Sequence, residues 1–253
     1  MLIKDNIKPQ SFVTAEYNVF AVYLINCALN VNWHLWIKDN IALLGDLKCR
    51  LYIIAIVNPG TEDDVKKVVN ESVSSHIIET NIEFYHENEF EYRGILKVWD
   101  LAQKNPGHND VILYYHSKNI TRATSPANND KNFNRVVTEH ANILNVFKLL
   151  NFVNKVGMYC SQSGFLWGNY FWARGSYISC VEKPIKTQRR HYYEDWISRR
   201  LKDPSVTQLS EIENRDYSKY IIDYQDCYNM NFYNKKIHNV GSYYHPHGDQ
   251  YVD

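Results

Sequence analysis

The chain has 253 residues, enough for one large domain or two small ones and for a sizeable core. It carries 28 basic and 28 acidic residues, and this zero net charge argues against a protein that binds nucleic acid mainly through phosphates. Hydrophobic residues make up 45% of the chain and charged residues 22%, which excludes intrinsic disorder and collagen-like structure.

Aromatic residues are frequent: 20 Tyr, 10 Phe and 6 Trp make up 14% of the chain. Tyr and Trp have a flat apolar face and a polar tip, which suits stacking against sugars or bases. An ordinary core, or a coding bias toward AT-rich codons, explains the same composition. The aromatic content alone therefore does not indicate a function.

The five cysteines are scattered and form no C-x-x-C pair, which argues against a zinc ribbon or a redox dithiol and favours free thiols in a reducing compartment. The first residues, MLIKDNIKPQ, lack the apolar core of a signal peptide. The most apolar stretch, residues 19–29, is interrupted by Asn26 and is shorter than the about 20 residues that span a bilayer. We therefore expect a soluble, cytoplasmic protein without a membrane span.

The first 116 residues alternate between apolar runs and segments with helical spacing. The apolar runs predict strands over residues 18–26, 50–57, 76–84 and 110–116. The helical spacing predicts helices over residues 33–47, 61–72 and 90–104, with Thr61 as the capping residue of the second. This order predicts an α/β fold with a mostly parallel central sheet and helices on both faces.

The second half has a less regular pattern. It predicts, in order, an Asn-rich loop, a long helix, a short strand, an aromatic strand and a last helix, over residues 119–132, 133–153, 156–159, 165–173 and 192–201. The remainder is rich in loop residues. No repeat or linker divides the chain, so we expect a single domain over residues 1–253.

Ligands of parallel sheets bind beyond the carboxyl ends of the strands, which directs attention to Asn26, to residues 58–60 and to His116, Ser117 and Lys118. Lys118 offers a compact positive charge, and Ser117 and backbone N–H groups offer donors, so the last three residues are suited to bind phosphate. The alternative is a solvated exit from a strand, where polar residues are common.

The aromatic run that contains Gly168, Asn169 and Trp172 is a second candidate. Glycine in such a run often marks the close approach of a ligand or another backbone. Asn169 and Trp172 could then bind a sugar by hydrogen bonding and stacking. The alternative is core packing with a bulge at Gly168.

The acidic pair Glu194 and Asp195 near an aromatic cluster is a third candidate, because a paired carboxylate can act as a general base. The alternative is structural: acids in a first helical turn complement the helix dipole, and Asp195 with Arg199 has the spacing of an i,i+4 ion pair.

Near the end of the chain, His245, His247 and Asp249 could bind a divalent metal, although their spacing matches no closed zinc motif and a terminal tail is the alternative. Other signatures are missing from the sequence. It has no G-x-G-x-x-G after the first strand, no Walker A loop and no G-x-S-x-G elbow, which disfavours dinucleotide-binding enzymes and α/β-hydrolases.

Three segments in this order, ILYYHSKN (112–119), GNYFWARGSYI (168–178) and HYYEDWISR (191–199), resemble GT-A-type nucleotide-sugar glycosyltransferases. The similar branch has a His-Ser/Thr-Lys motif after the fourth strand and includes bacterial rhamnan-synthesis proteins and glycosyltransferases of large DNA viruses. The segment FEYRGILKVWDLA (90–102) fits the lead-in to that strand and adds Arg93 to the donor-binding residues. The resemblance implies a Rossmann-like GT-A domain that binds a nucleotide-sugar through residues 18–120 and a glycan acceptor through residues 121–253.

The resemblance also implies a mechanism. Asp195, paired with Glu194, would take the proton of the acceptor hydroxyl in an inverting displacement, and Lys118 would stabilise the leaving nucleoside diphosphate, for which UDP is favoured. The usual D-x-D metal motif is replaced by His116-Ser117-Lys118, so Mn²⁺ or Mg²⁺ would need ligands such as His116, His245 or His247. A non-catalytic sugar- or nucleotide-binding protein and a retaining transferase are the alternatives.

Overall fold

The computed structural model describes residues 17–29, 32–117, 143–151, 153–157, 166, 169–188, 190–203, 227–230 and 237–239. The first part of the chain alternates strands and helices: β1 (Asn18–Asn26), α1 (Trp33–Ala42), β2 (Cys49–Ile56), α2 (Glu62–Ser72), β3 (Ile77–Tyr85), α3 (Tyr92–Lys104) and β4 (Asp110–His116). The second part contributes α5 (Ile143–Leu150), β5 (Lys155–Gly157), β6 (Phe171–Arg174), α6 (Gly175–Ile178), α7 (Arg190–Asp195), β7 (Cys227–Met230) and β8 (Ile237–Asn239).

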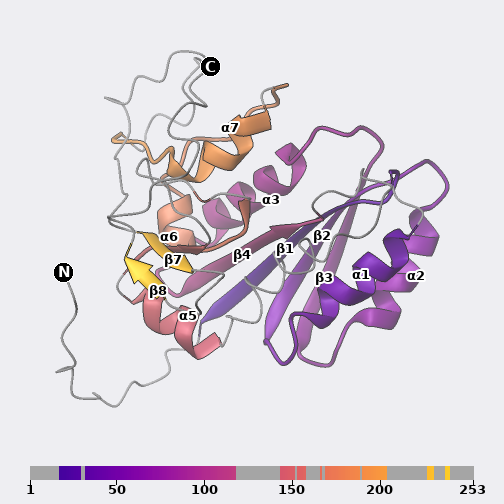
Figure 1. Cartoon of the computed structure of the whole chain (residues 1–253), viewed down its shortest axis with the longest axis horizontal. Helices are drawn as coiled ribbons and strands as arrows, with labels where there is room; N and C mark the ends of the chain where they lie inside the picture. The colour runs from indigo at the N-terminus through magenta and orange to yellow at the C-terminus, as the bar shows by residue number, and fades with distance from the viewer. Residues whose placement is uncertain are drawn as a thin grey trace.

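All of these strands belong to one eight-stranded sheet with the order β3-β2-β1-β4-β6-β5-β7-β8 (Figure 1). The strands β1 to β4 are parallel to one another, and β6 lies antiparallel between β4 and β5. Farther out, β7 is parallel to β5 and antiparallel to β8. The sheet therefore confirms the predicted α/β class with a mostly parallel centre.

The winding direction of the chain reverses at β1. From β1 the chain adds β2 and β3 on one side, and then returns to place β4 on the other side of β1. Helices α1, α2 and α5 pack on one face of the sheet, and α3, α6 and α7 pack on the other, as the two core clusters and Figure 1 show. The carboxyl ends of β1 and β4 consequently form the switch point at which doubly wound sheets bind ligands.

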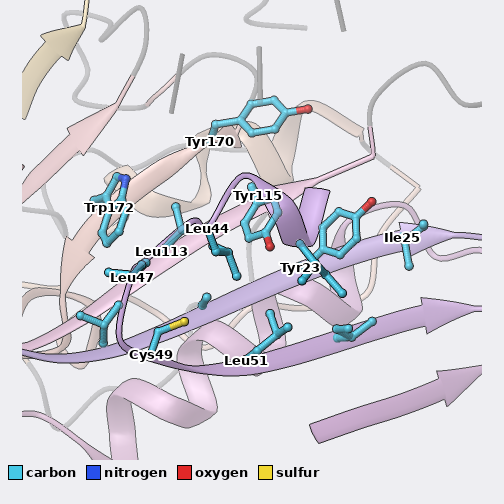
Figure 2. Packing of buried hydrophobic residues seen from close by; sticks show 14 of the residues in the cluster. Tyr23, Ile25, Leu44, Leu47, Cys49, Leu51, Leu113, Tyr115, Tyr170 and Trp172 are labelled. Atoms are coloured by element: carbon cyan, nitrogen blue, oxygen red, sulfur yellow. The ribbon is translucent and has the colours of Figure 1, made fainter. Parts of the chain in front are cut away.

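The core explains much of the aromatic content. The rings of Tyr23 on β1 and Tyr115 on β4 stack with centroids 4.8 Å apart, and Tyr170 and Trp172 extend this layer toward β6 (Figure 2). On the opposite face, Tyr114 packs in a second buried layer, between the sheet and helices that include α3 and α7. Strands buried on both faces need apolar residues at successive positions, which is why β1 and β4 read as continuous apolar runs.

Two of the predicted helices have different ends in the structure. The helix predicted over residues 33–47 ends at Ala42, and the chain turns at Gly45, which has a φ of 52°. The helix predicted from residue 90 begins at Tyr92, because Phe90 has a left-handed backbone with a φ of 53°. Thr61 does occupy the N-cap of α2, but its hydroxyl donates to the carbonyl of Asn58 at 2.8 Å instead of accepting from the helix.

The second half shows larger differences. The short strand lies at Lys155–Gly157, and the aromatic strand begins only at Phe171, after Asn169 with a left-handed φ of 57°. The last helix stops at Asp195 and is followed by a 3-10 helix, Trp196–Ser198, and by an antiparallel bridge between Arg200 and Val181. Strands β7 and β8 were not predicted.

Helix α5 confirms part of the long helix predicted over residues 133–153, whose first ten residues lie outside the described part of the chain, as does the predicted loop over residues 119–132. Within the described residues, no helix is long and apolar enough to cross a membrane.

Helix α3 approaches β4 closely at Gly94. A Cβ atom at this position would lie 2.8 Å from the Cε2 and hydroxyl oxygen of Tyr114 and 3.1 Å from the Cβ of Leu24. In a helix interior, alanine is ordinarily more favourable than glycine by about 1 kcal/mol. We expect Gly94→Ala instead to lower the free energy of unfolding by about 1–3 kcal/mol, because the added methyl overpacks the core. Chemical denaturation measures the change.

Tyr114→Phe provides the control, because the Tyr114 hydroxyl is buried and has no hydrogen-bond partner among the residues that the structure describes. Removing this hydroxyl should leave the stability unchanged or raise it. The double variant should regain part of the stability that Gly94→Ala loses. A stabilising Gly94→Ala would contradict the close contact.

Candidate functional site

Polar groups converge where β1 and β4 end side by side. In the parallel pairing, Leu24 lies next to His116. The backbone N–H of Ser117 donates to the Leu24 carbonyl at 2.9 Å, and the backbone N–H of Asn26 donates to the Ser117 hydroxyl at 3.3 Å. The structure thus brings Asn26, His116 and Ser117 together, whereas Lys118 lies outside the described residues.

His116 is buried and held from two sides. Its ring stacks on Tyr170 with centroids 4.6 Å apart, and the Tyr170 hydroxyl donates to the His116 carbonyl at 2.9 Å. Its Nε2 lies 3.7 Å from Oε1 of Glu91, a buried carboxylate at the N-cap of α3. The imidazole therefore has a fixed orientation at the carboxyl edge of the sheet, with a carboxylate beside it.

Asn169 lies at the same edge. The pairing of β4 with β6 ends at Tyr114 and Phe171, so Tyr170 and Asn169 continue past it alongside His116. Asn169 is completely buried, and neither its Oδ1 nor its Nδ2 has a hydrogen-bond partner in the described part of the chain; the same holds for the buried Oδ1 of Asn26. Because such groups are costly to bury unpaired, they are expected at sites where a ligand or water supplies the partner.

Arg93 lies at the rim of this site, on α3. Its guanidinium forms an ion pair with Glu89 and lies 4.4 Å from the centroid of the Tyr85 ring. Lys186 also binds Glu89 and lies 3.2 Å from Glu87. Burial raises the pKa of Glu89, but the hydrogen bonds from Lys186 and Arg93 outweigh it and lower the pKa. Arg93 therefore faces the edge with its charge partly balanced.

The acidic pair on α7 divides into two different environments. The Oδ2 of Asp195 accepts from Nε and Nη2 of Arg199 at 3.0 and 2.9 Å, and its Oδ1 accepts from the Ser198 hydroxyl at 3.0 Å. Arg199 also binds Oε1 of Glu182 at 3.1 Å. The i,i+4 ion pair that the sequence left open is thus present. Among the described residues, the buried carboxylate of Glu194 has no hydrogen-bond or ion-pair partner.

Helix α7 packs against the same edge as His116. The ring of Tyr193 lies 6.5 Å from that of Tyr92, the first residue of α3. Burial raises the pKa of Tyr193, a hydrogen bond with the backbone of Thr187 opposes this, and the nearby charges of Glu89 and Glu91 raise it further. The segment before α3 therefore lies close both to α7, which carries the acidic pair, and to the switch point.

Of the remaining predicted residues, the structure describes Trp172, which is not brought to this edge. Trp172 is fully buried in the layer of α1, α2 and α5, where it packs edge-on against Phe147 with centroids 6.2 Å apart. Its position supports the alternative of core packing. Gly168, like His245 and His247, lies outside the described residues.

The described residues do not form a metal site. No group of three His, Cys, Asp or Glu side chains that could hold an ion occurs among them, and His116 with Glu91 supplies only two ligands.

Sequence reasoning missed Glu91, whose carboxylate lies beside the His116 imidazole. Its only signal is the sequence Glu89-Phe90-Glu91 at the start of a predicted helix, where acids are ordinary. Nothing in the spacing indicates that the carboxylate of Glu91 turns toward a histidine 25 positions later.

No family model and no curated protein matches the chain. One similar solved structure is the mannosyltransferase PcManGT from Pyrobaculum calidifontis in complex with GDP-Man and Mn²⁺; it is 10% identical over 64% of this chain and 45% of that chain, with a TM-score of 0.37. A mycobacterial protein is 12% identical over 66% of this chain and 56% of that chain, with a TM-score of 0.35. This chain thus spans about half the length of either structure, and likenesses this weak identify neither a family nor an activity.

The buried ion pairs of Arg199 yield a prediction about stability. Arg199→Met leaves Asp195 and Glu182 buried without their counter-ion. We expect it to lower the free energy of unfolding by about 3–5 kcal/mol in urea denaturation.

Lys66→Met is the matched control, because Lys66 and Asp63 form an ion pair 2.9 Å long between exposed side chains. Its loss should change the stability by less than about 1 kcal/mol. Equal effects of the two substitutions would contradict a structural role for the Arg199 network.

Proposed function

We propose that the protein is a glycosyltransferase that moves a sugar from a nucleotide-sugar, with UDP-sugars as the favoured donors, to a hydroxyl of a glycan acceptor. The observation that carries the proposal is the hydrogen-bonded convergence of Asn26, His116 and Ser117 at the switch point of the sheet. Doubly wound sheets bind nucleotides at this point. The three motifs that resemble GT-A enzymes provide the chemistry.

The donor binds across the ends of β1 and β4. The buried amides of Asn26 and Asn169 have unused hydrogen-bonding atoms that suit the hydroxyls of a sugar or ribose. Lys118 follows directly after Ser117 and supplies the positive charge that stabilises the leaving diphosphate. Arg93 adds a cation at the rim.

The acceptor hydroxyl reacts beside α7. Its oxygen forms a bond to the anomeric carbon while the bond to the diphosphate oxygen breaks, and a carboxylate takes the hydroxyl proton. We propose Glu194 for this role, because its carboxylate has no partner among the described residues. Proton transfer to Asp195 would have to break its hydrogen bonds with Arg199 and Ser198, so Asp195 acts as a positioning residue.

Two alternatives have distinct tests. One alternative is a protein that binds a nucleotide-sugar without turnover. It is favoured by the contacts of the Asp195 carboxylate with Arg199, because the resemblance assigns the base role to Asp195. Slow hydrolysis of the bound donor would argue against it. A retaining transferase is distinguished by the anomeric configuration of the product, which NMR determines.

The donor prediction is tested by thermal shift. The full chain is melted with UDP-, GDP- and dTDP-sugars, with and without Mn²⁺. A ligand at 100 times its Kd stabilises by about 2.7 kcal/mol, which raises the melting temperature by about 5–10 °C for a chain of this size. Lys118→Ala should weaken free UDP binding at least about tenfold, because the phosphate loses its counter-charge.

Lys66→Ala, on the exposed surface of α2, is the control and should leave UDP affinity unchanged. The absence of a shift with every nucleotide-sugar would overturn the proposed function.

The base assignment is tested by comparing Glu194→Gln with Asp195→Asn. Glu194→Gln should lower kcat by about 10²–10⁴-fold with little change in donor affinity or melting temperature, because a positioned base contributes that much. Asp195→Asn should lower the melting temperature, since it breaks a buried ion pair. A hundredfold loss of kcat in Asp195→Asn at an unchanged melting temperature, with Glu194→Gln active, would return the base role to Asp195.

A further inference from the structure

Phe90 has an unusual backbone for its residue type. It lies in the turn between β3 and α3 and has a left-handed φ of 53°, a conformation that bulky side chains rarely adopt. Its ring is also left partly in solvent, with 38% of the residue exposed. Both features cost free energy in the folded state, so we asked what maintains them.

The neighbours of Phe90 fix its position. Glu89 is buried and bound by Arg93 and Lys186, and Glu91 is buried with its Oε1 3.7 Å from Nε2 of His116. The chain must turn sharply to bury both carboxylates, and the aromatic ring between them is directed outward. The exposed ring thus belongs to a segment that touches His116 at the switch point.

Other apolar side chains of the described residues are more exposed than Phe90 but differ in kind or place. The large exposed hydrophobic residues are Leu29, Leu35, Ile78 and Phe90. Phe90 alone among them is aromatic, and Ile78 lies near the start of β3, at the opposite edge of the sheet.

We propose that Phe90 is a stacking platform for a sugar ring, an inference that rests on the proposed function and adds a binding residue to that site. The apolar C–H face of a pyranose covers the ring, which removes apolar surface from water. Glu87 and Glu89 beside the ring are paired with Lys186 and Arg93, so this surface carries little net charge and suits a neutral sugar. This sugar is part of the donor or of the acceptor.

The experiment uses the full chain with Phe90→Gly and Phe90→Trp. Glycine relieves the left-handed backbone, so the melting temperature should stay the same or rise. Binding to an array of immobilised glycans, or to the nucleotide-sugar that gives the largest thermal shift, should weaken by about tenfold. Phe90→Trp should keep the affinity within about threefold, because it preserves a flat ring.

Several controls separate the outcomes. Ile78→Ala removes a more exposed apolar side chain at the other edge and should change neither the melting temperature nor the binding. A loss confined to the glycan array places the acceptor on Phe90, and a loss confined to the nucleotide-sugar places the donor there. A weakened affinity for free UDP would identify base stacking instead and overturn the sugar platform.

Two further outcomes would overturn the inference. One is a melting temperature lowered by more than about 4 °C in Phe90→Gly, which would make Phe90 a packing residue. The other is sugar binding that Phe90→Gly leaves unchanged, or that the unsubstituted protein does not show. If glycan binding depends on Phe90 but no nucleotide-sugar binds, the proposed transferase function would be wrong, while Phe90 would still be a stacking platform for a sugar.

Discussion

The parallel pairing of β1 with β4 is the constraint on which the rest of the structure depends. Because β4 lies on the side of β1 opposite to β2, the connections that contain α1 and α2 cover one face of the sheet, and the connection that contains α3 covers the other. The same pairing places Leu24 beside His116, so the two strands end together and their terminal polar groups meet. A shift of one residue in this register would turn the side chain of His116 to the other face.

The polar tips of aromatic residues hold the second half of the chain on this framework. The indole N–H groups of Trp99 and Trp196 donate to the carbonyls of Val181 and Glu182 at 3.1 and 2.8 Å, and the Tyr193 hydroxyl donates to the carbonyl of Thr187 at 2.9 Å. These bonds join the segment after α6 to α3 and α7. The aromatic residues therefore fix the position of these segments, and with it the position of Glu194, in addition to filling the core.

The sequence predicted best where one physical signal dominated. Strand β1 matches its predicted range, residues 18–26, because both of its faces are buried and its apolar run is unbroken. Prediction failed where a single backbone torsion decided the outcome: nothing in the sequence marks Phe90 as left-handed, and asparagine only favours this conformation, yet both Phe90 and Asn169 displaced the start of an element. In the site, the polar strand ends were predictable, whereas the contact of Glu91 with His116 depends on packing between α3 and β4.

The two left-handed positions also support the location of the site without any appeal to resemblance. Among the described residues, Phe90 and Asn169 are the non-glycine residues with positive φ. Each directly precedes a residue that contacts His116: Glu91 approaches its Nε2, and Tyr170 stacks on its ring. Strained backbone persists only where the surroundings enforce it, and it concentrates at functional sites. Two distant segments thus turn through left-handed residues, strained at Phe90 and tolerated at Asn169, beside one histidine, at the edge where the topology alone would place a ligand.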